Sequence, residues 1–205
     1  MPKKAVRKRR PTSKKQASPI KMLLIPFVIL ALYYIVYKPD TSYHLSPFGK
    51  EEVPSEYMPI YKAAEEEYGV PWNLLAAHHR VETKFSKMKT LISPVGAEGH
   101  MQFMPCTFVG WSHPSCSGLG KGNIPKSQKT NPDVIAKYGG YGVDANGDGV
   151  ADPFQIEDAV FSAANYLASN GAAEGKIEQA VFAYNHSEEY VEDILYYAKR
   201  YIKDE

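Results

Sequence analysis

The chain has 205 residues, of which 44% are hydrophobic and 12% aromatic. This composition fits a globular core with appendages and excludes an intrinsically disordered protein. The net charge of +1 hides an asymmetry, because residues 1–21 contain nine Lys or Arg and no acid, whereas the remainder carries 15 basic and 23 acidic residues. One basic tail on an acidic body does not indicate a nucleic-acid groove, so no nucleic-acid partner is expected.

The basic tail leads directly into an uncharged apolar segment at residues 22–37. The segment is slightly shorter than the about 20 residues of a spanning helix, but flanking lysines can snorkel and extend it. Tyr33, Tyr34 and Tyr37 lie toward one end, where an interfacial aromatic belt is expected. The sequence therefore predicts a basic cytoplasmic tail (1–21) and a single-pass transmembrane helix (22–37), which places the rest on the extracytoplasmic side of the cell membrane.

Two other interpretations of this segment are weaker. A cleaved signal peptide needs a cleavage site between small residues, and none follows Ile35. A buried core helix fits poorly beside nine positive charges. The anchor is followed by a predicted linker at residues 38–54, which contains Pro39, Pro47, Gly49 and Pro54.

Helical periodicity dominates residues 55–205, and no sustained alternation of apolar and polar residues predicts a strand. Pro59 and Pro71 each open a predicted helix, the first ending at Gly69 and the second continuing through Phe85. Residues 99–110 have a helical composition that Pro105 interrupts, 112–130 are expected to be loop, and 131–138 a short helix. The fold class is therefore predicted to be mainly α.

Three predicted helices finish the chain. The first spans residues 156–169 and ends at Asn170 and Gly171, and the second spans 176–184. The third begins at Ser187, a good N-cap with two glutamates in its first turn. It is expected to bury one face, made of Val191, Ile194, Leu195, Ala198 and Ile202.

Glu82 lies on the apolar stripe of the second helix, together with Leu75, His78 and Phe85. Spacings of three, four and three residues place all four on one face. A carboxyl carried into an apolar cleft loses hydration, which raises its pKa and suits it to general-acid catalysis near neutral pH. An ordinary surface glutamate is the alternative, and His78 and His79 are expected to be structural.

Four stretches carry a family resemblance: "VETKFS", "GAEGHMQFMPCTF", "YGVDANGDGVADPFQIEDAVFSAANYL" and "AYNHSEEYV". In this order they resemble the lytic transglycosylases of the bacterial cell wall, and most of all the membrane-bound B type. The resemblance covers about residues 55–200. It implies a lysozyme-like α fold, an enzyme rather than a binding module, and peptidoglycan glycan strands as the partner.

The resemblance also implies site residues. It makes Glu82 the catalytic acid and places Gln102, Phe103, Ser86, Tyr184 and Asn185 in the sugar-binding cleft. An amide can donate to and accept from an N-acetyl group, and a tyrosine offers an apolar face with a polar tip.

The implied reaction uses one carboxylate, unlike most glycosidases, and no cofactor. Glu82 protonates the oxygen between N-acetylmuramic acid and N-acetylglucosamine, and then deprotonates the muramic acid 6-hydroxyl, so that a 1,6-anhydro sugar forms without water. Glu98 is interpreted as a loop residue. Two alternatives are a hydrolysing muramidase on the same fold and a non-catalytic wall-binding module.

The acidic stretch "DANGDGVAD" begins like a calcium loop, with Asp144, Asn146 and Asp148 at positions 1, 3 and 5, and the carbonyl of Val150 at position 7. Position 12 is Gln155, a poor ligand. The resemblance implies a longer loop whose last acidic ligand is Asp158. A structural Ca²⁺ is therefore expected, with a metal-free Asn/Gly turn as the alternative.

Cys106 and Cys116 are the two cysteines of the chain, and both fall on the predicted external side. Oxidising surroundings favour a disulfide between them, with free thiols as the alternative. Closing so short a loop would contribute somewhat less than about 3 kcal/mol. The resembled family usually has serine at the position of Cys106, so the bridge would be local to this protein.

Overall fold

The computed structural model describes residues 52–203, which form helices and connecting loops without a named strand in that range. Only two isolated bridges occur there, pairing Glu98 with Ile92 and with Phe103. The elements in chain order are η1 (Ser55–Tyr57), α2 (Met58–Tyr68), α3 (Trp72–Thr83), α4 (Pro105–Val109), α5 (Lys126–Lys129), α6 (Pro132–Tyr138), α7 (Ile156–Ser169), η2 (Ala172–Glu174), α8 (Ile177–Asn185) and α9 (Glu188–Lys203).

Helix α2 begins and ends, and helix α3 begins, at the residues that the sequence singled out. Pro59 lies in the first turn of α2, and Gly69 ends it in a left-handed conformation (φ 68°) that glycine adopts without steric cost. The N–H of Trp72, at the start of α3, donates to the Glu65 carboxylate of α2 (3.1 Å). A free helix-end donor is thus satisfied by the neighbouring helix.

The last long helices also follow the sequence prediction. Helix α7 spans the predicted residues, and Ser187 caps α9 by accepting from the N–H of Tyr190 (3.3 Å). One predicted core residue is wrong: Ile202 is 58% exposed, while Tyr201 is buried in its place. The face of α9 rotates away from Ile202 in the last turn because Tyr201 packs near Phe85 (ring centroids 6.3 Å apart).

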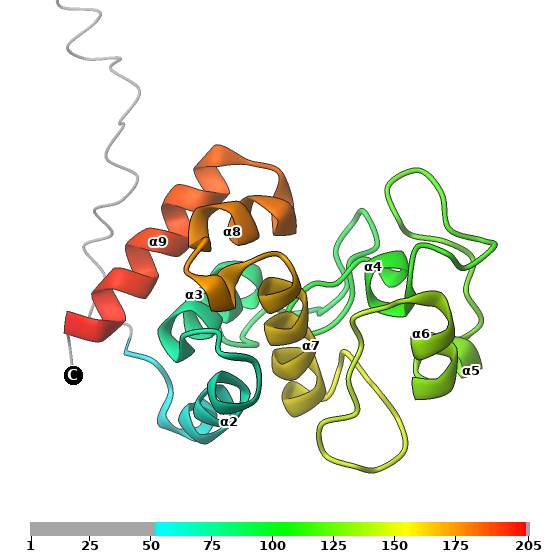
Figure 1. The fold of residues 1–205 in the computed structure, drawn as a ribbon, viewed down its shortest axis with the longest axis horizontal. Coiled ribbons are helices and arrows are strands. Elements are labelled where there is room, and N and C mark those ends of the chain that lie inside the picture. The colour runs from blue at the N-terminus through cyan, green and yellow to red at the C-terminus, as the bar shows by residue number, and fades with distance from the viewer. Residues whose placement is uncertain (1–51, 204–205) are drawn as a thin grey trace, which may run out of the picture. The chain divides into compact units, whose positions relative to one another are not determined.

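Helix α3 is the centre of the larger helical group. It packs most extensively on α9 and also contacts α2 and α7, while α8 packs on α9. The fully buried side chains at these contacts include Tyr61, Leu75, Val160, Leu167 and Ile194. Helices α4, α5 and α6 contact one another and lie on the opposite side of α7 from α2, α3 and α9 (Figure 1).

Residues 99–110 are only partly helical, although their composition favours a helix. A helix forms only from Pro105, and the preceding residues turn sharply, with Gly99 and Gln102 at positive φ (83° and 51°). A Cβ on Gly99 would lie 1.9 Å from the Pro153 carbonyl oxygen, so only glycine fits. Residues 112–130 are loop as predicted, except for the short α5 at their end.

The predicted tail and transmembrane anchor (1–37), and most of the linker, lie outside residues 52–203. Within that range no helix has both the length and the apolar character needed to cross a membrane.

Candidate active site

Helix α3 ends in an unusual turn, directly after Glu82. Lys84, Phe85 and Ser86 all have positive φ (53°, 56° and 65°), a left-handed run that costs about 1–2 kcal/mol per non-glycine residue. The predicted helix through Phe85 is therefore wrong in its last two residues. The turn nevertheless buries Phe85 (3% exposed), because the chain folds back across the end of α3.

Glu82 lies in the last turn of α3, partly exposed, with protein around most of its carboxyl. Its Oε1 accepts a hydrogen bond from the Tyr190 hydroxyl of α9 (2.5 Å). Burial raises the pKa of Glu82 to about 7, although the bond from Tyr190 acts in the opposite direction. Glu82 can therefore hold a proton near neutral pH, as a general acid must.

A second hydrogen bond connects the Tyr190 hydroxyl to His78. The Tyr190 hydroxyl lies 2.9 Å from Nδ1 of His78, a fully buried side chain whose pKa burial lowers to about 3. Since the single Tyr190 proton goes to Glu82, neutral His78 must donate from Nδ1. Its Nε2 then keeps a lone pair, and that atom has no hydrogen-bond partner among residues 52–203. Because Tyr190 donates to Oε1, the transferable proton of Glu82 belongs on Oε2.

Ser86 holds the turn after Glu82 through an ordered chain of hydrogen bonds. The Phe154 carbonyl accepts from Nε2 of His100 (2.9 Å), so neutral His100 accepts at Nδ1 from Ser86 Oγ (2.6 Å). Ser86 Oγ in turn accepts from Nε2 of His79 (2.7 Å), whose Nδ1 accepts from the Tyr61 hydroxyl (2.6 Å). Burial lowers the pKa of His79 to about 3, so this histidine is neutral. Ser86 thus stabilises the left-handed turn, and one lone pair is left for a ligand.

A cavity of about 240 Å³ lies next to Tyr184 of α8. Its lining includes three of the predicted sugar-binding residues, Gln102, Phe103 and Tyr184, together with the half-exposed Trp111. The Tyr184 ring stacks on that of Tyr190 (centroids 6.4 Å apart, planes 7° apart) and donates its hydroxyl proton to the Met101 carbonyl (2.9 Å). Burial, and then the charge of Glu82, raise the pKa of Tyr184. Tyr184 therefore connects the cavity to the partner of Glu82.

Gln102 presents its amide in one defined orientation. Both N–H bonds of its side chain are used, because Nε2 donates to the carbonyls of Leu91 (3.1 Å) and Gly99 (2.8 Å). The side chain can therefore offer only its Oε1 to a ligand. The sequence predicted that this amide would both donate to and accept from the ligand. In the structure it can only accept, which suits the N–H of an acetamido group.

Three of the predicted site residues, Glu82, Ser86 and Asn185, do not line this cavity. Asn185 is exposed at the end of α8, and the cavity takes Ala183, Tyr184 and His186 from this segment. Conversely, sequence reasoning missed Tyr190 and Trp111. The signal for Tyr190 was available, because a tyrosine on the buried face of α9 needs a partner for its hydroxyl.

The polar side chains of the predicted calcium ligands accept hydrogen bonds from backbone N–H groups of the same loop. The Asp144 carboxylate accepts from the N–H groups of Gly147, Asp148 and Gly149 at 2.8–3.1 Å. The side chains of Asn146 and Asp148 accept from backbone N–H groups two residues ahead, and Asp148 also accepts from Gln155, which lowers its pKa.

Asp158 closes the loop onto α7. This buried carboxylate accepts from the N–H groups of Ala145 (2.9 Å), Asn146 (3.4 Å) and Asp152 (2.8 Å), and burial raises its pKa despite these bonds. Across residues 52–203, no group of three or more His, Cys, Asp or Glu is arranged to hold a metal ion. The ligand types suit Ca²⁺, and an oxygen that accepts one N–H keeps a second lone pair, but no contact here tests the site, so calcium binding stays a prediction.

A disulfide joins Cys106 of α4 to Cys116, with Cα atoms 5.7 Å apart. The N–H of Cys106 also donates to the Gly120 carbonyl (2.8 Å). Together these bonds tie α4 to the loop that carries Trp111 and Leu119, two residues of the cavity wall.

Comparison with protein-family models gives a match over part of the chain. Residues 134–184 match the family model described as transglycosylase SLT domain, which is about a quarter of the chain. The match supports a glycan-cleaving transglycosylase that acts on peptidoglycan. The matched segment contains the acidic loop, α7 and Tyr184, but ends before Tyr190 and does not include Glu82. No curated protein matches the chain.

Proposed function

We propose that this protein is a membrane-anchored lytic transglycosylase similar to the membrane-bound B type, with its catalytic domain on the extracytoplasmic side. It cleaves the bond between N-acetylmuramic acid and N-acetylglucosamine. The observation that carries the proposal is Glu82, a single carboxyl with a pKa of about 7 whose Oε1 is held by Tyr190. The match of residues 134–184 to a transglycosylase domain supports the substrate class. Calcium in the acidic loop belongs to the proposal as a structural ion.

In the proposed reaction, the Oε2 proton of Glu82 moves to the glycosidic oxygen as its bond to the anomeric carbon breaks. The acetamido carbonyl of the muramic acid shares the positive charge that develops on that carbon. The Glu82 carboxylate then takes the proton of the 6-hydroxyl, whose oxygen bonds to the anomeric carbon. Glu82 ends protonated, as it began, and no water is consumed.

The surrounding residues support this cycle. Tyr190 donates to Oε1 both before and after proton transfer, which keeps Oε2 as the reactive oxygen. Gln102 Oε1 accepts from the acetamido N–H, and Tyr184 and Trp111 provide flat apolar surfaces for sugar rings. Ser86 keeps the end of α3 in place and offers its remaining lone pair to a hydroxyl.

The test is mass spectrometry of purified peptidoglycan after digestion by the full-length protein in detergent. The wild type is expected to release anhydro-muropeptides. Glu82→Gln, which preserves shape but cannot transfer a proton, is expected to lose at least about 10²–10⁴-fold of the rate. Reducing-end products, heavier by one water, would instead indicate a hydrolysing muramidase. Wall binding without products from either protein would indicate a non-catalytic module.

Glu98→Gln is the matched control for a second catalytic carboxylate. Glu98 pairs with Lys129 and lines a different cavity from Gln102 and Tyr184. On glycan strands without peptides, its amide variant is therefore expected to retain most turnover. Equal loss in Glu98→Gln and Glu82→Gln would refute the mechanism with one carboxylate.

A further inference from the structure

A second cavity, of about 330 Å³, shares only Phe103, among the described residues, with the cavity lined by Gln102 and Tyr184. It lies among α4, α5 and the segment that leads into α7. Most of its wall is apolar, including Phe103, Phe108, Ile124 and the exposed edge of Phe154. The two cavities are therefore neighbours with different walls, and the proposed reaction uses only the first.

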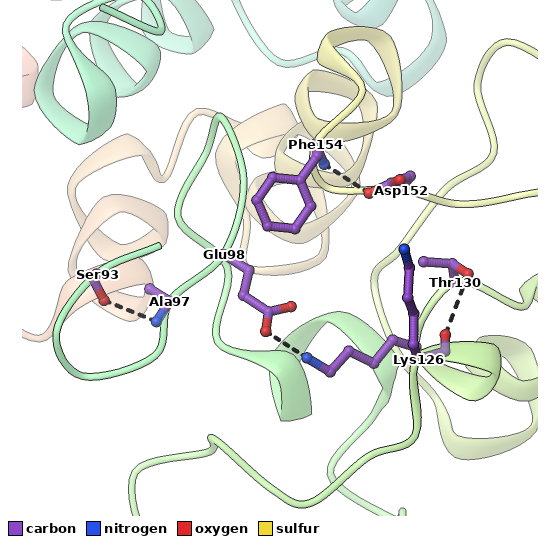
Figure 2. Close-up of polar contacts among 8 residues, drawn as sticks. Ser93, Ala97, Glu98, Lys126, Thr130, Asp152 and Phe154 are labelled. Carbon is purple, nitrogen blue, oxygen red and sulfur yellow. Dashed lines mark hydrogen bonds and ion pairs between the residues drawn. The ribbon is translucent and has the colours of Figure 1, made fainter. Parts of the chain in front are cut away.

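Charges of both signs are set into this apolar wall. Glu98 and Lys129 form an ion pair (2.5 Å) whose side chains are only 18% and 25% exposed. Lys126 and Asp152 also line the cavity, and the exposed Lys126 has no ion pair within the part of the chain that the structure describes. Figure 2 shows Glu98, Lys126 and the Phe154 ring gathered around this space.

These charged groups keep unused bonding capacity. The Glu98–Lys129 contact occupies one carboxylate oxygen and one of three ammonium protons. Asp152 accepts the Phe154 N–H at Oδ1 (2.9 Å), which leaves its Oδ2 available. The cavity can thus receive an ammonium at its carboxylates and a carboxylate at its lysines.

This combination favours a zwitterionic ligand over a sugar. A neutral sugar offers no charge to either sign, and among the described residues Thr130 is the one lining residue with a side-chain hydroxyl. A ligand with one charge would pair with only one sign of the charges in the wall. An α-amino-acid head group on a short aliphatic chain satisfies both signs and fills the apolar part.

We propose that this cavity binds the zwitterionic end of a peptidoglycan stem peptide, the free ammonium and carboxylate of a diaminopimelate side chain. The proposal rests on the function proposed above, because the glycan in the first cavity carries such peptides. Lys126 binds the carboxylate, and Glu98 with Asp152 binds the ammonium. Phe103 separates the peptide site from the sugar site.

The test is calorimetric titration of the full-length protein with two stem tripeptides. One ends in diaminopimelate and the other in lysine, which has the ammonium but lacks the second carboxylate. The diaminopimelate peptide is expected to bind about tenfold more tightly, as one charge-assisted contact allows. Equal affinities, or no binding of either peptide, would overturn the proposal.

Lys126→Ala is expected to remove this preference, so that both peptides bind alike. Lys121→Ala, at an exposed lysine that does not line the cavity, is the matched control and should keep the tenfold difference. An unchanged preference in Lys126→Ala would contradict the assignment. Asp152→Asn, which keeps the Glu98–Lys129 pair, is expected to weaken binding of both peptides, and unchanged affinities there would also contradict it.

Digestion of glycan strands without peptides separates this proposal from the enzymatic one. Anhydro products from those strands, combined with failed peptide titrations, would remove the peptide site and leave the enzyme. Peptide binding as expected, without products from any glycan, would keep the binding site while removing the transglycosylase.

Discussion

The end of α3 and the acidic loop at residues 144–158 both carry carboxylates that the sequence marks as functional, but their surroundings differ. Asp144 and Asp158 each accept three backbone N–H groups, whereas Glu82 accepts one hydroxyl proton, from Tyr190. The loop carboxylates stabilise a fold of the backbone. The Glu82 carboxyl, desolvated and with fewer partners, has a pKa near 7.

This contrast indicates that a carboxyl becomes a reactive acid when it is desolvated and has few hydrogen bonds. Many acidic residues close together do not have this effect. Backbone donors stabilise the charged form of a carboxylate, while burial destabilises it. Even buried Asp158, whose pKa is raised, is held by donors that oppose the effect of burial. Four predictions test this contrast between Glu82 and the carboxylates of the acidic loop.

The largest expected effect is on the pH dependence of stability. Because the folded pKa of Glu82 lies above its ordinary value of 4.5, its contribution to stability is complete below about pH 4.5 and is lost as pH rises through about 7. From about pH 5 to about pH 8, the wild type should lose about 2–3 kcal/mol relative to Glu82→Gln. Denaturant unfolding of both proteins measures this difference, in which the titration of the buried histidines cancels. A constant difference would contradict the raised pKa.

Asp158→Asn tests the structural role of the loop carboxylates. An amide offers one acceptor oxygen in place of two, so at least one of the three backbone N–H groups loses its partner. The expected loss of unfolding free energy is about 1–3 kcal/mol. Asp133→Asn, at an exposed position in the first turn of α6, is the control, with an expected change within about 0.5 kcal/mol. Equal effects would mean that the Asp158 bonds contribute nothing.

Tyr190→Phe tests the hydroxyl that holds Glu82. The lost hydrogen bond had lowered the pKa of Glu82, so this pKa should rise further. The alkaline limb of the pH–rate profile should therefore move to higher pH, in addition to any loss of rate. Tyr197→Phe, on the same helix with its ring against Arg80, is the control. A lower rate with an unchanged alkaline limb would mean that Tyr190 contributes only through packing.

The smallest effect is expected from calcium. At about 1 mM Ca²⁺, a site of the weak extracellular class would add about 1 kcal/mol or less of stability. Thermal unfolding of the full-length protein with Ca²⁺ and with chelator measures this. Identical midpoints would remove the structural ion from the proposal.

Much of the fold was predictable because local signals and tertiary packing agree. Pro59, Gly69, Asn131 and Ser187 start or end helices through their own backbone preferences or side-chain caps, and the structure uses all four in these roles. The turn at Lys84–Ser86 was not predictable. No glycine marks it, and it exists because contacts from distant segments, such as His100 to Ser86, outweigh its local strain.

The candidate site was predictable in its acid but not in its partners. Glu82 was indicated by its place on an apolar helix face. The distance from Glu82 to Tyr190, 108 residues later in the chain, depends on how α9 packs against α3. Gln102 was found only through the family resemblance, and the use of its two N–H bonds follows from a left-handed turn that the sequence does not announce.

The most direct test of the central claim is a titration of the Glu82 carboxyl by carbon NMR, with the full-length protein labelled at glutamate and Glu82→Gln used to assign the signal. A pKa of about 7 would establish a carboxyl that holds its proton at neutral pH because of desolvation. A pKa near the ordinary 4.5 would contradict the account, since Glu82 would then be a charged surface residue without a proton to give.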